Sequence, residues 1–170
     1  YHYHAALVKC LSASGLVAQP WNNPDPPPDQ PSPIIAYAFD GFPIYGPYEC
    51  TDASCSGVHE LLSSWDNVGY SAGTVGCTSS AACGSTRTCA AVMINGAPQT
   101  ACVPKTCSWT NNQYVAKSGN SYLDRCNGHY GPNGDYHYHA TLTFPYLLGC
   151  YRGTPTSNGG TGSPPGGSCS

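Results

Sequence analysis

Alternation of large and small apolar side chains over residues 34–48 predicts a β-hairpin. In the segment IIAYAFDGFPIYGPY, Tyr37 and Phe39 alternate with alanines, and a second apolar run returns after the dipeptide Asp40-Gly41. An Asp-Gly pair between two such runs is typical of a type I′ hairpin turn. We therefore expect this hairpin to form a central part of the core.

A Tyr-His-Tyr-His motif occurs twice, at residues 1–4 and 136–139. Successive side chains of a strand point to opposite faces, so both histidines of each copy share one face, with Cα atoms about 6 to 7 Å apart. Two imidazoles at this spacing can reach one metal ion, although a half-buried strand whose histidines bond to backbone carbonyls explains the pattern equally well. Because similarity between the copies extends beyond the motif, we expect two equivalent strands that lie close together.

The position of His129 depends on the register of a second hairpin, predicted within residues 120–153. A two-residue turn places Tyr130 opposite His137 and turns His129 to the other face, whereas a three-residue turn over residues 132–134 places His129 opposite His137. Only the second register gives a three-histidine cluster. The candidate metal ligands are His2, His4, His137, His139 and His129.

Proline-rich and cysteine-rich segments separate these elements. Residues 19–33 are predicted to form an extended polyproline II strap on the surface. Residues 50–107 contain seven cysteines among small residues. We expect an insertion of short strands there, with a helical turn near residues 59–63. Disulfides, more than packing, are expected to stabilise this insertion. The domain is predicted over residues 1–153. The tail, residues 154–170, is rich in Gly, Ser and Pro, and a segment of this composition is not expected to order by itself.

Composition excludes several classes of function. Charged residues make up 9 % of the chain and the net charge is −3, which removes the electrostatic footprint of a nucleic-acid-binding protein. The 20 glycines and 16 prolines predict little helix, and no run of about 18 apolar residues predicts a membrane span. The sequence contains no N-x-S/T acceptor site, so any attached glycan is expected to be O-linked.

The 11 cysteines indicate a disulfide framework formed in an oxidising, extracellular compartment. No C-x-x-C pair is present, which argues against zinc-ribbon and thioredoxin-like sites. The odd count leaves one thiol over, and Cys169 in the tail is our candidate for a free or intermolecular cysteine. The cysteines expected in disulfides are Cys10, Cys50, Cys55, Cys77, Cys83, Cys89, Cys102, Cys107, Cys126 and Cys150.

Two segments, residues 38–48 and 123–153, resemble the YHYH family of secreted proteins, which is largely without an assigned activity. The resemblance implies an extracellular all-β domain rather than a reaction. Family members usually carry a Cys/Gly/His segment before the first motif, which is missing ahead of Tyr1, and the stretch 50–107 is longer than usual. The family signature falls on Asp40, Gly41, Pro43, Tyr45, Gly46, Cys126, Gly128, His129, His137, His139, Gly149 and Cys150.

The chemistry that the sequence supports best is metal binding by imidazoles, which suit Cu(II) or Zn(II). Asp40 and Asp135 are candidates for acceptors that orient the imidazoles, but an Asp before Gly at a hairpin turn is more often there for turn geometry, so neither counts as catalytic evidence. His59 stands alone and is expected at the surface. No hydrolase motif or close carboxylate pair is present, and the sequence therefore favours a protein that is not an enzyme.

We expect an all-β fold, specifically a disulfide-stapled antiparallel β-sandwich with long Pro/Gly-rich loops and a Cys-rich insertion. The predicted function is a secreted structural building block of an extracellular or cell-surface assembly. In this interpretation the chain forms a homo-oligomer or filament, docks through its tail or Pro-rich strap, and carries O-linked glycans. The alternative is a Cu- or Zn-binding protein or metalloenzyme, and the third interpretation is a carbohydrate-binding module that uses the abundant Tyr and Trp side chains.

Overall fold

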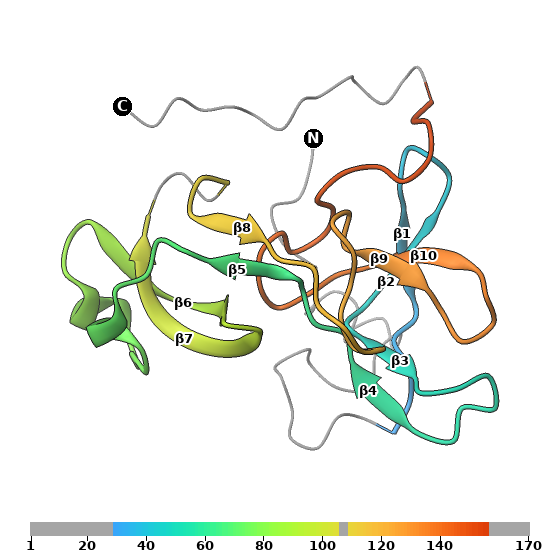
Figure 1. Cartoon of the computed structure of the whole chain (residues 1–170), viewed down its shortest axis with the longest axis horizontal. Helices are drawn as coiled ribbons and strands as arrows, with labels where there is room; N and C mark the ends of the chain where they lie inside the picture. The colour runs from blue at the N-terminus through green and yellow to red at the C-terminus, as the bar shows by residue number, and fades with distance from the viewer. Residues whose placement is uncertain (1–28, 106–108, 157–170) are drawn as a thin grey trace.

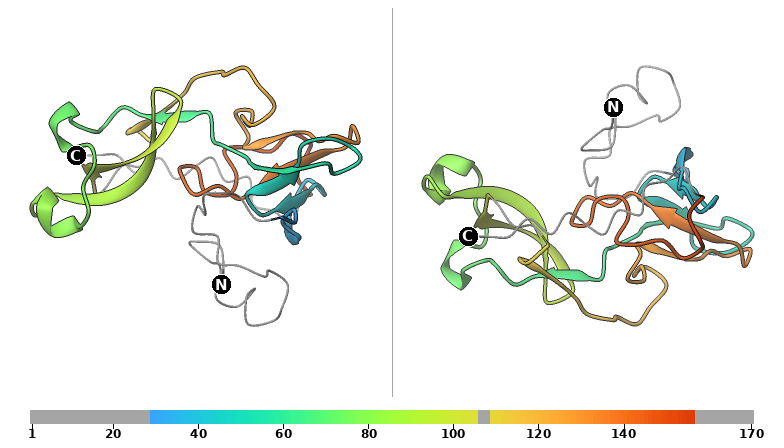
Figure 2. Two further views of the ribbon diagram at one scale, coloured as in Figure 1. Left: turned by 90° about the horizontal axis from the view of Figure 1, so that it is seen from below. Right: turned by 90° about the horizontal axis from the view of Figure 1, so that it is seen from above.

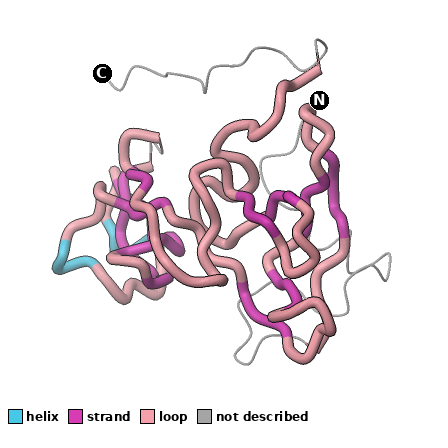
Figure 3. Tube along the Cα trace, turned by 45° about the vertical axis from the view of Figure 1, so that its right-hand side comes forward, coloured by secondary structure: helices cyan, strands magenta, loops and turns pink. Residues whose placement is uncertain are grey.

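The computed structural model describes residues 29–105 and 109–156, which form two lobes of strands joined by irregular loops (Figure 1). The described residues contain no α-helix, only two short 3-10 helices, η1 (Ala72–Thr74) and η2 (Ser80–Cys83). Loops and short strands dominate the trace (Figure 3). The predicted all-β class is therefore confirmed, whereas the helical turn predicted near residues 59–63 is wrong because a strand begins at Val58.

The first lobe is built on a four-stranded sheet in the order β1-β2-β10-β9. Strands β1 and β2 form the predicted hairpin, and β9 and β10 form the second one. The two hairpins meet through β2 and β10, which run parallel, so this sheet is mixed rather than purely antiparallel. Its strands are β1 (Ile34–Tyr37), β2 (Pro43–Tyr45), β9 (Gly128–Tyr130) and β10 (Tyr136–His139).

The turn of the first hairpin differs from the predicted type I′ turn. The Gly41 amide donates a hydrogen bond to the Ala38 carbonyl, and the Ala38 amide donates to the Phe42 carbonyl. Three residues thus form the loop, with Gly41 at a positive φ of 89°. A three-residue loop of this kind needs a left-handed residue only at its last position, which explains why Asp40 need not adopt a positive φ.

The second hairpin uses the same kind of loop. Its turn bond runs from the Gly134 amide to the Gly131 carbonyl, and Gly134 has a φ of 83°. The Gly131 amide then bonds to the Asp135 carbonyl, which closes the ladder. This is the three-residue turn, and it sets the register in which His137 lies opposite His129.

Apolar and aromatic side chains fill the space beneath this sheet. Tyr138 is fully buried and Tyr136 is nearly so, and both pack with Ile44 and with the ring of Phe42. The tyrosine hydroxyls are tied to carboxylates, Tyr138 to Asp40 at 2.5 Å and Tyr136 to Asp124 at 2.8 Å. The tyrosines of the motif thus serve the core, which leaves the opposite face of β10 to the histidines.

A separate two-stranded ladder, β3 (Tyr48–Cys50) with β4 (Val58–Glu60), follows β2 directly. The Cys50–Cys55 disulfide closes the loop between the two strands. In this ladder Glu49 lies opposite His59. The short connection from β2 carries Glu49 towards the histidine-bearing face of the first sheet.

The second lobe is a four-stranded sheet in the order β7-β6-β5-β8, set beside the first lobe in both views of Figure 2. The longest strands of the described chain, β6 and β7, meet at a two-residue turn, Asn95-Gly96, where both residues have positive φ. Val92, Ile94, Ala101 and Val103 form a small core between them. The strands are β5 (Trp65–Asn67), β6 (Arg87–Ile94), β7 (Ala97–Pro104) and β8 (Asn112–Tyr114).

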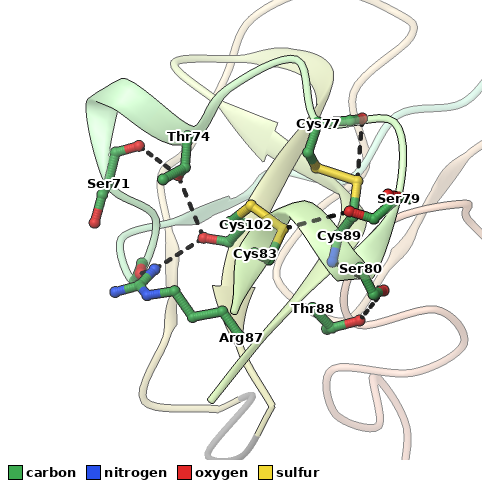
Figure 4. Close-up of a disulfide and its surroundings, with 11 residues drawn as sticks. Ser71, Thr74, Cys77, Ser79, Ser80, Cys83, Arg87, Thr88, Cys89 and Cys102 are labelled. Atoms are coloured by element: carbon green, nitrogen blue, oxygen red, sulfur yellow. Dashed lines mark hydrogen bonds between the residues drawn. A yellow bond between two sulfur atoms is a disulfide. The ribbon is translucent and has the colours of Figure 1, made fainter. Parts of the chain in front are cut away.

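The Cys83–Cys102 disulfide ties η2 to β7, and the Cys77–Cys89 disulfide ties the segment between η1 and η2 to β6 (Figure 4). The Arg87 guanidinium donates to the Cys102 carbonyl at 2.8 Å and fixes the same corner. Packing and disulfides therefore act together in a lobe that we expected disulfides to dominate. All eight cysteines of the described ranges are paired, while Cys10, Cys107 and Cys169 lie outside these ranges.

Aromatic packing joins the lobes. The indole of Trp65 on β5 packs edge-on against Phe144, which follows β10, with ring centroids 5.6 Å apart. The Trp65 Nε1–H donates to the Arg125 carbonyl at 3.1 Å. A half-buried ion pair joins Lys117 to Asp66. Asp66 also accepts a hydrogen bond from the Gly96 amide, so this ion pair lies close to the β6–β7 turn.

Candidate metal centre

Three histidine side chains project from β9 and β10 towards one point. His137 and His139 are two residues apart on β10 and so share a face, and His129 lies directly opposite His137 on β9. The ring centroids of the three histidines are 4.9 to 5.1 Å apart. The alternation of a strand, together with the three-residue turn, is sufficient to assemble this cluster.

Glu49 supplies a carboxylate from β3 to the same point. Its Oε1 atom lies 2.8 Å from His137 Nε2, and its Oε2 atom lies 3.1 Å from His129 Nε2. His139 Nε2 is 3.3 Å from His129 Nε2 and 3.9 Å from Glu49 Oε1. The four ligand-type atoms lie within 4.8 Å of one another, so these residues could hold one metal ion.

Backbone carbonyls fix the orientation of two of the rings. His139 Nδ1 lies 2.6 Å from the Gly46 carbonyl oxygen, and His137 Nδ1 lies 3.0 Å from the Asp135 carbonyl oxygen. A carbonyl oxygen only accepts hydrogen bonds, so each Nδ1 must carry the proton. The Nε2 atoms are therefore the nitrogens turned to the centre, and metal-binding histidines commonly show this arrangement.

The loop that carries Gly131 touches the cluster closely. A Cβ atom placed on Gly131 would meet His137 Cε1 and would lie 2.7 Å from Glu49 Oε1. Tyr45 packs its ring 4.9 Å from the His137 ring on the other side. The ligand set is thus enclosed between β2, the β9–β10 turn and β3.

Burial and hydrogen bonding set the charges in the centre. Burial lowers the pKa of His139 to about 3, so this imidazole is neutral at physiological pH. Burial also raises the pKa of the Glu49 carboxyl, but hydrogen bonds from His129 and His137 outweigh it and bring the value to about 2. The centre therefore holds an ionised carboxylate beside a neutral imidazole lone pair, which is the protonation state that metal binding requires.

Comparison with known proteins places the chain in a family. A family model described as YHYH protein matches residues 1–153. The chain belongs to the YHYH family. No curated protein and no solved structure matches it.

The second YHYH motif supplies two of the cluster's ligands, His137 and His139, and His129 joins them as the three-residue register predicts. The first YHYH motif, with the predicted ligands His2 and His4, lies outside the described residues. Glu49 was not predicted. It stands between the first hairpin and the Cys-rich segment, and no spacing in the sequence connects it with the YHYH histidines.

Other residues singled out in the sequence have different positions in this YHYH domain. His59 was expected at the surface but is half-buried, with Nδ1 3.0 Å from Ser121 Oγ. Asp40 accepts the Tyr138 hydroxyl and the Gly153 amide. Asp135 orients His137 through its backbone carbonyl. Both aspartates therefore act in the local structure of the hairpins.

Two cavities border the cluster of Glu49, His129, His137 and His139. One, of about 220 Å³, is lined by Tyr45, His137 and His139 among others. The second, of about 350 Å³, is lined by His59 and His129. Glu49 lines both cavities. No helix in the described part of the chain is long and apolar enough to cross a bilayer.

Acidification is expected to destabilise the metal-free domain as the pH falls from about 6.5 towards 3. The folded state keeps His139 neutral down to a pKa of about 3, whereas the unfolded chain protonates this residue near its ordinary value of 6.5. The unfolded state thus binds more protons in this range, and the free energy of unfolding decreases as the pH falls. Glu49 acts in the same direction at lower pH, because its pKa lies near 2 instead of 4.5.

Urea denaturation in the presence of a chelator, at about pH 7, about 5.5 and about 4, measures this effect. We expect the midpoint to decrease at each step. A constant or rising midpoint would contradict the burial of a neutral His139.

Proposed function

We propose that this domain binds a divalent transition-metal ion, Zn(II) or Cu(II), through Glu49, His129, His137 and His139. The observation that carries the proposal is the convergence of three Nε2 atoms and one carboxylate within 4.8 Å of one another. Imidazole and carboxylate ligands suit both metals. The role we propose for the ion is structural, because it would link the β3–β4 ladder to the β9–β10 hairpin.

The spacing of the ligand atoms supports this proposal. Ligands about 2.0 to 2.1 Å from a tetrahedral zinc ion lie about 3.3 to 3.4 Å from one another. The distances from His129 Nε2 to His139 Nε2 and to Glu49 Oε2 are 3.3 and 3.1 Å, and the Glu49 to His137 contact is 2.8 Å. Small side-chain movements therefore suffice to surround one ion.

The arrangement of protons also favours a cation. The Nδ1 atoms of His137 and His139 face carbonyl oxygens, so in the neutral rings both Nε2 atoms present lone pairs. One of these lone pairs, on His137, faces the Glu49 carboxylate at 2.8 Å. Without a metal, this contact is held by the proton that His137 donates to Glu49. A metal ion that takes the place of this proton would contact all the central ligands together.

The cellular setting belongs to the same proposal. Four disulfides among the described residues are typical of a protein from an oxidising compartment, which supports an extracellular location. The role as a building block of an oligomer or filament stays a prediction, because the tail after residue 156 and most of the Pro-rich strap lie outside the described residues. The carbohydrate-binding interpretation also stays a prediction.

A metal titration of the full chain tests the proposal. After treatment with a chelator, the protein is titrated with ZnSO₄ or CuSO₄, and bound metal is measured by mass spectrometry after gel filtration. We expect tight binding and a higher melting temperature, since a ligand present at about 100 times its Kd stabilises by about 2.7 kcal/mol. The His137→Ala/His139→Ala variant is expected to lose the ion and the thermal shift.

Two further variants keep the test decisive if the double variant fails to fold. His129 is less enclosed, with a side-chain exposure of 15 %, so His129→Ala should fold and bind the metal more weakly. Tyr37→Phe on the edge strand β1, where the side chain is 68 % exposed, is the control and should bind as the natural sequence does. Absence of bound metal in the natural sequence, or unchanged binding by His129→Ala, would overturn the proposal.

A further inference from the structure

His59 lies beside Glu49. The two residues are directly opposite each other in the antiparallel β3–β4 ladder. Residues paired in this way share a face, with Cβ atoms about 4.5 to 5.5 Å apart. The side chain of His59 therefore emerges next to that of Glu49, on the face that carries the carboxylate to the histidine cluster.

The His59 ring is held in the same manner as the rings of the cluster. Its Nδ1 atom is 3.0 Å from Ser121 Oγ, just as the Nδ1 atoms of His137 and His139 face backbone carbonyl oxygens. A hydrogen bond at one ring nitrogen orients the imidazole and leaves the other nitrogen for a metal. The Ser121 hydroxyl can donate or accept a hydrogen bond, and in the tautomer in which it accepts from Nδ1, Nε2 is the atom that His59 offers as a ligand.

A cavity separates His59 from His129. Its volume is about 350 Å³, and Glu49, Thr51 and Asn120 also line it. A water molecule needs only about 10 to 15 Å³ of such space, so an ion and several waters fit. The wall of this cavity offers two imidazoles and one carboxylate, which is the number of protein ligands found in open zinc sites. His59 is not among the residues whose ligand atoms lie within 4.8 Å of one another, so its side chain must move towards Glu49 to bind an ion here.

The Glu49 carboxylate is placed to serve two ions. Its Oε1 atom is directed at His137, at 2.8 Å, while its Oε2 atom is directed at His129, at 3.1 Å. We propose that Glu49 bridges two divalent metal ions, the second of which is held by His59 and His129 in this cavity. This inference rests on the proposed metal-binding function and extends it from one ion to a two-metal site, where ions are typically about 3.5 to 4 Å apart.

The two ions would differ in affinity. His139 and His137 are almost fully enclosed, with side-chain exposures of 1 % and 11 %, and they hold the first ion with Oε1 of Glu49. His129 completes the first site while one ion is bound and turns to the second ion when that ion enters, because its Nε2 atom has one lone pair and can bind only one ion. The second ion takes its remaining ligands from water in the cavity, and it shares the only carboxylate of the described cluster with the first ion. The second site is therefore the weaker one and fills at higher metal concentration.

Metal counting on the full chain tests this inference. Titration with ZnSO₄, followed by native mass spectrometry, is expected to show two ions per chain for the natural sequence and one for His59→Ala. Ser121→Ala keeps the ligand but frees the ring, so the Kd of the second ion should rise by roughly 10- to 100-fold. Glu60→Gln changes the next residue of β4, which points to the other face, and should keep both ions.

Electron paramagnetic resonance with Cu(II) gives an independent readout. Two Cu(II) ions bridged by one carboxylate couple magnetically, so the integrated signal should be well below the copper content, and His59→Ala should restore the signal of an isolated ion. The His2→Ala/His4→Ala variant controls for binding at the first motif and should retain both ions and the coupling.

The outcomes separate the two proposals. A natural sequence that binds no metal overturns the proposed function and this inference with it. Saturation at one ion, two ions retained by His59→Ala, or a second ion lost only in His2→Ala/His4→Ala overturns the two-metal site alone.

Discussion

Replacing Cys126 and Cys150 together with serine is expected to lower the free energy of unfolding by about 3 kcal/mol and to weaken metal binding. The disulfide joins residues separated by 24 positions, and closure of a loop of this size contributes about 3 kcal/mol in the chain-entropy account. The same loop contains β9 and β10, which carry all three histidines of the cluster. Without the bridge the ligands must be ordered when the metal binds, and we expect roughly a tenfold rise in Kd or more.

Removal of the Cys77–Cys89 disulfide provides a matched control. This bridge spans 12 positions in the second lobe, so its loss should cost a similar amount, about 3 kcal/mol. It touches none of the ligands, and the Kd for metal should stay unchanged. Urea denaturation and metal titration of both double variants measure the two effects. Equal metal affinities in the two variants would show that the Cys126–Cys150 bridge does not preorganise the centre.

The strand pattern of the first lobe could be predicted because each signal is local. Alternation around Tyr37 and the Asp40-Gly41 pair indicated the first hairpin, although the loop has three residues and not two. The Asn95-Gly96 turn of the second lobe is also a local hairpin signal, so the long β6–β7 hairpin was within reach of sequence reasoning. Sheet order was not, because the parallel pairing of β2 with β10 joins segments that are distant in the sequence.

The candidate site was predictable only where a strand carries it. The two-residue period of β10 places His137 and His139 together, and the turn length decides whether His129 joins them. Glu49 reaches the centre from the β3–β4 ladder, whose position depends on packing against the first sheet. A single Glu beside a cysteine carries no periodic or spacing signal, so tertiary structure alone reveals it.

Replacing Gly131 with alanine is expected to disrupt the metal centre more than the fold. The added Cβ would meet His137 Cε1 and lie 2.7 Å from Glu49 Oε1, so two ligands must move. Overpacking of this kind typically costs about 1 to 3 kcal/mol. Loss of a residue that orients a metal ligand typically raises the Kd for metal by roughly 10- to 100-fold. Displacement of two ligands, the Glu49 carboxylate and the His137 imidazole, should raise the Kd by at least this factor.

Gly73→Ala is the matched control for this substitution. A Cβ atom at Gly73 meets nothing within 4 Å, and the residue has no positive φ. Alanine there should leave metal binding unchanged and should be neutral or stabilising by about 0.4 to 1 kcal/mol, because it restricts the unfolded chain. Thermal unfolding with and without ZnSO₄ distinguishes the variants, since Gly131→Ala should lose most of the metal-dependent shift. If Gly131→Ala keeps the full shift, the β9–β10 turn does not lie against the ligands as the structure shows, and the geometry on which the metal centre depends is wrong.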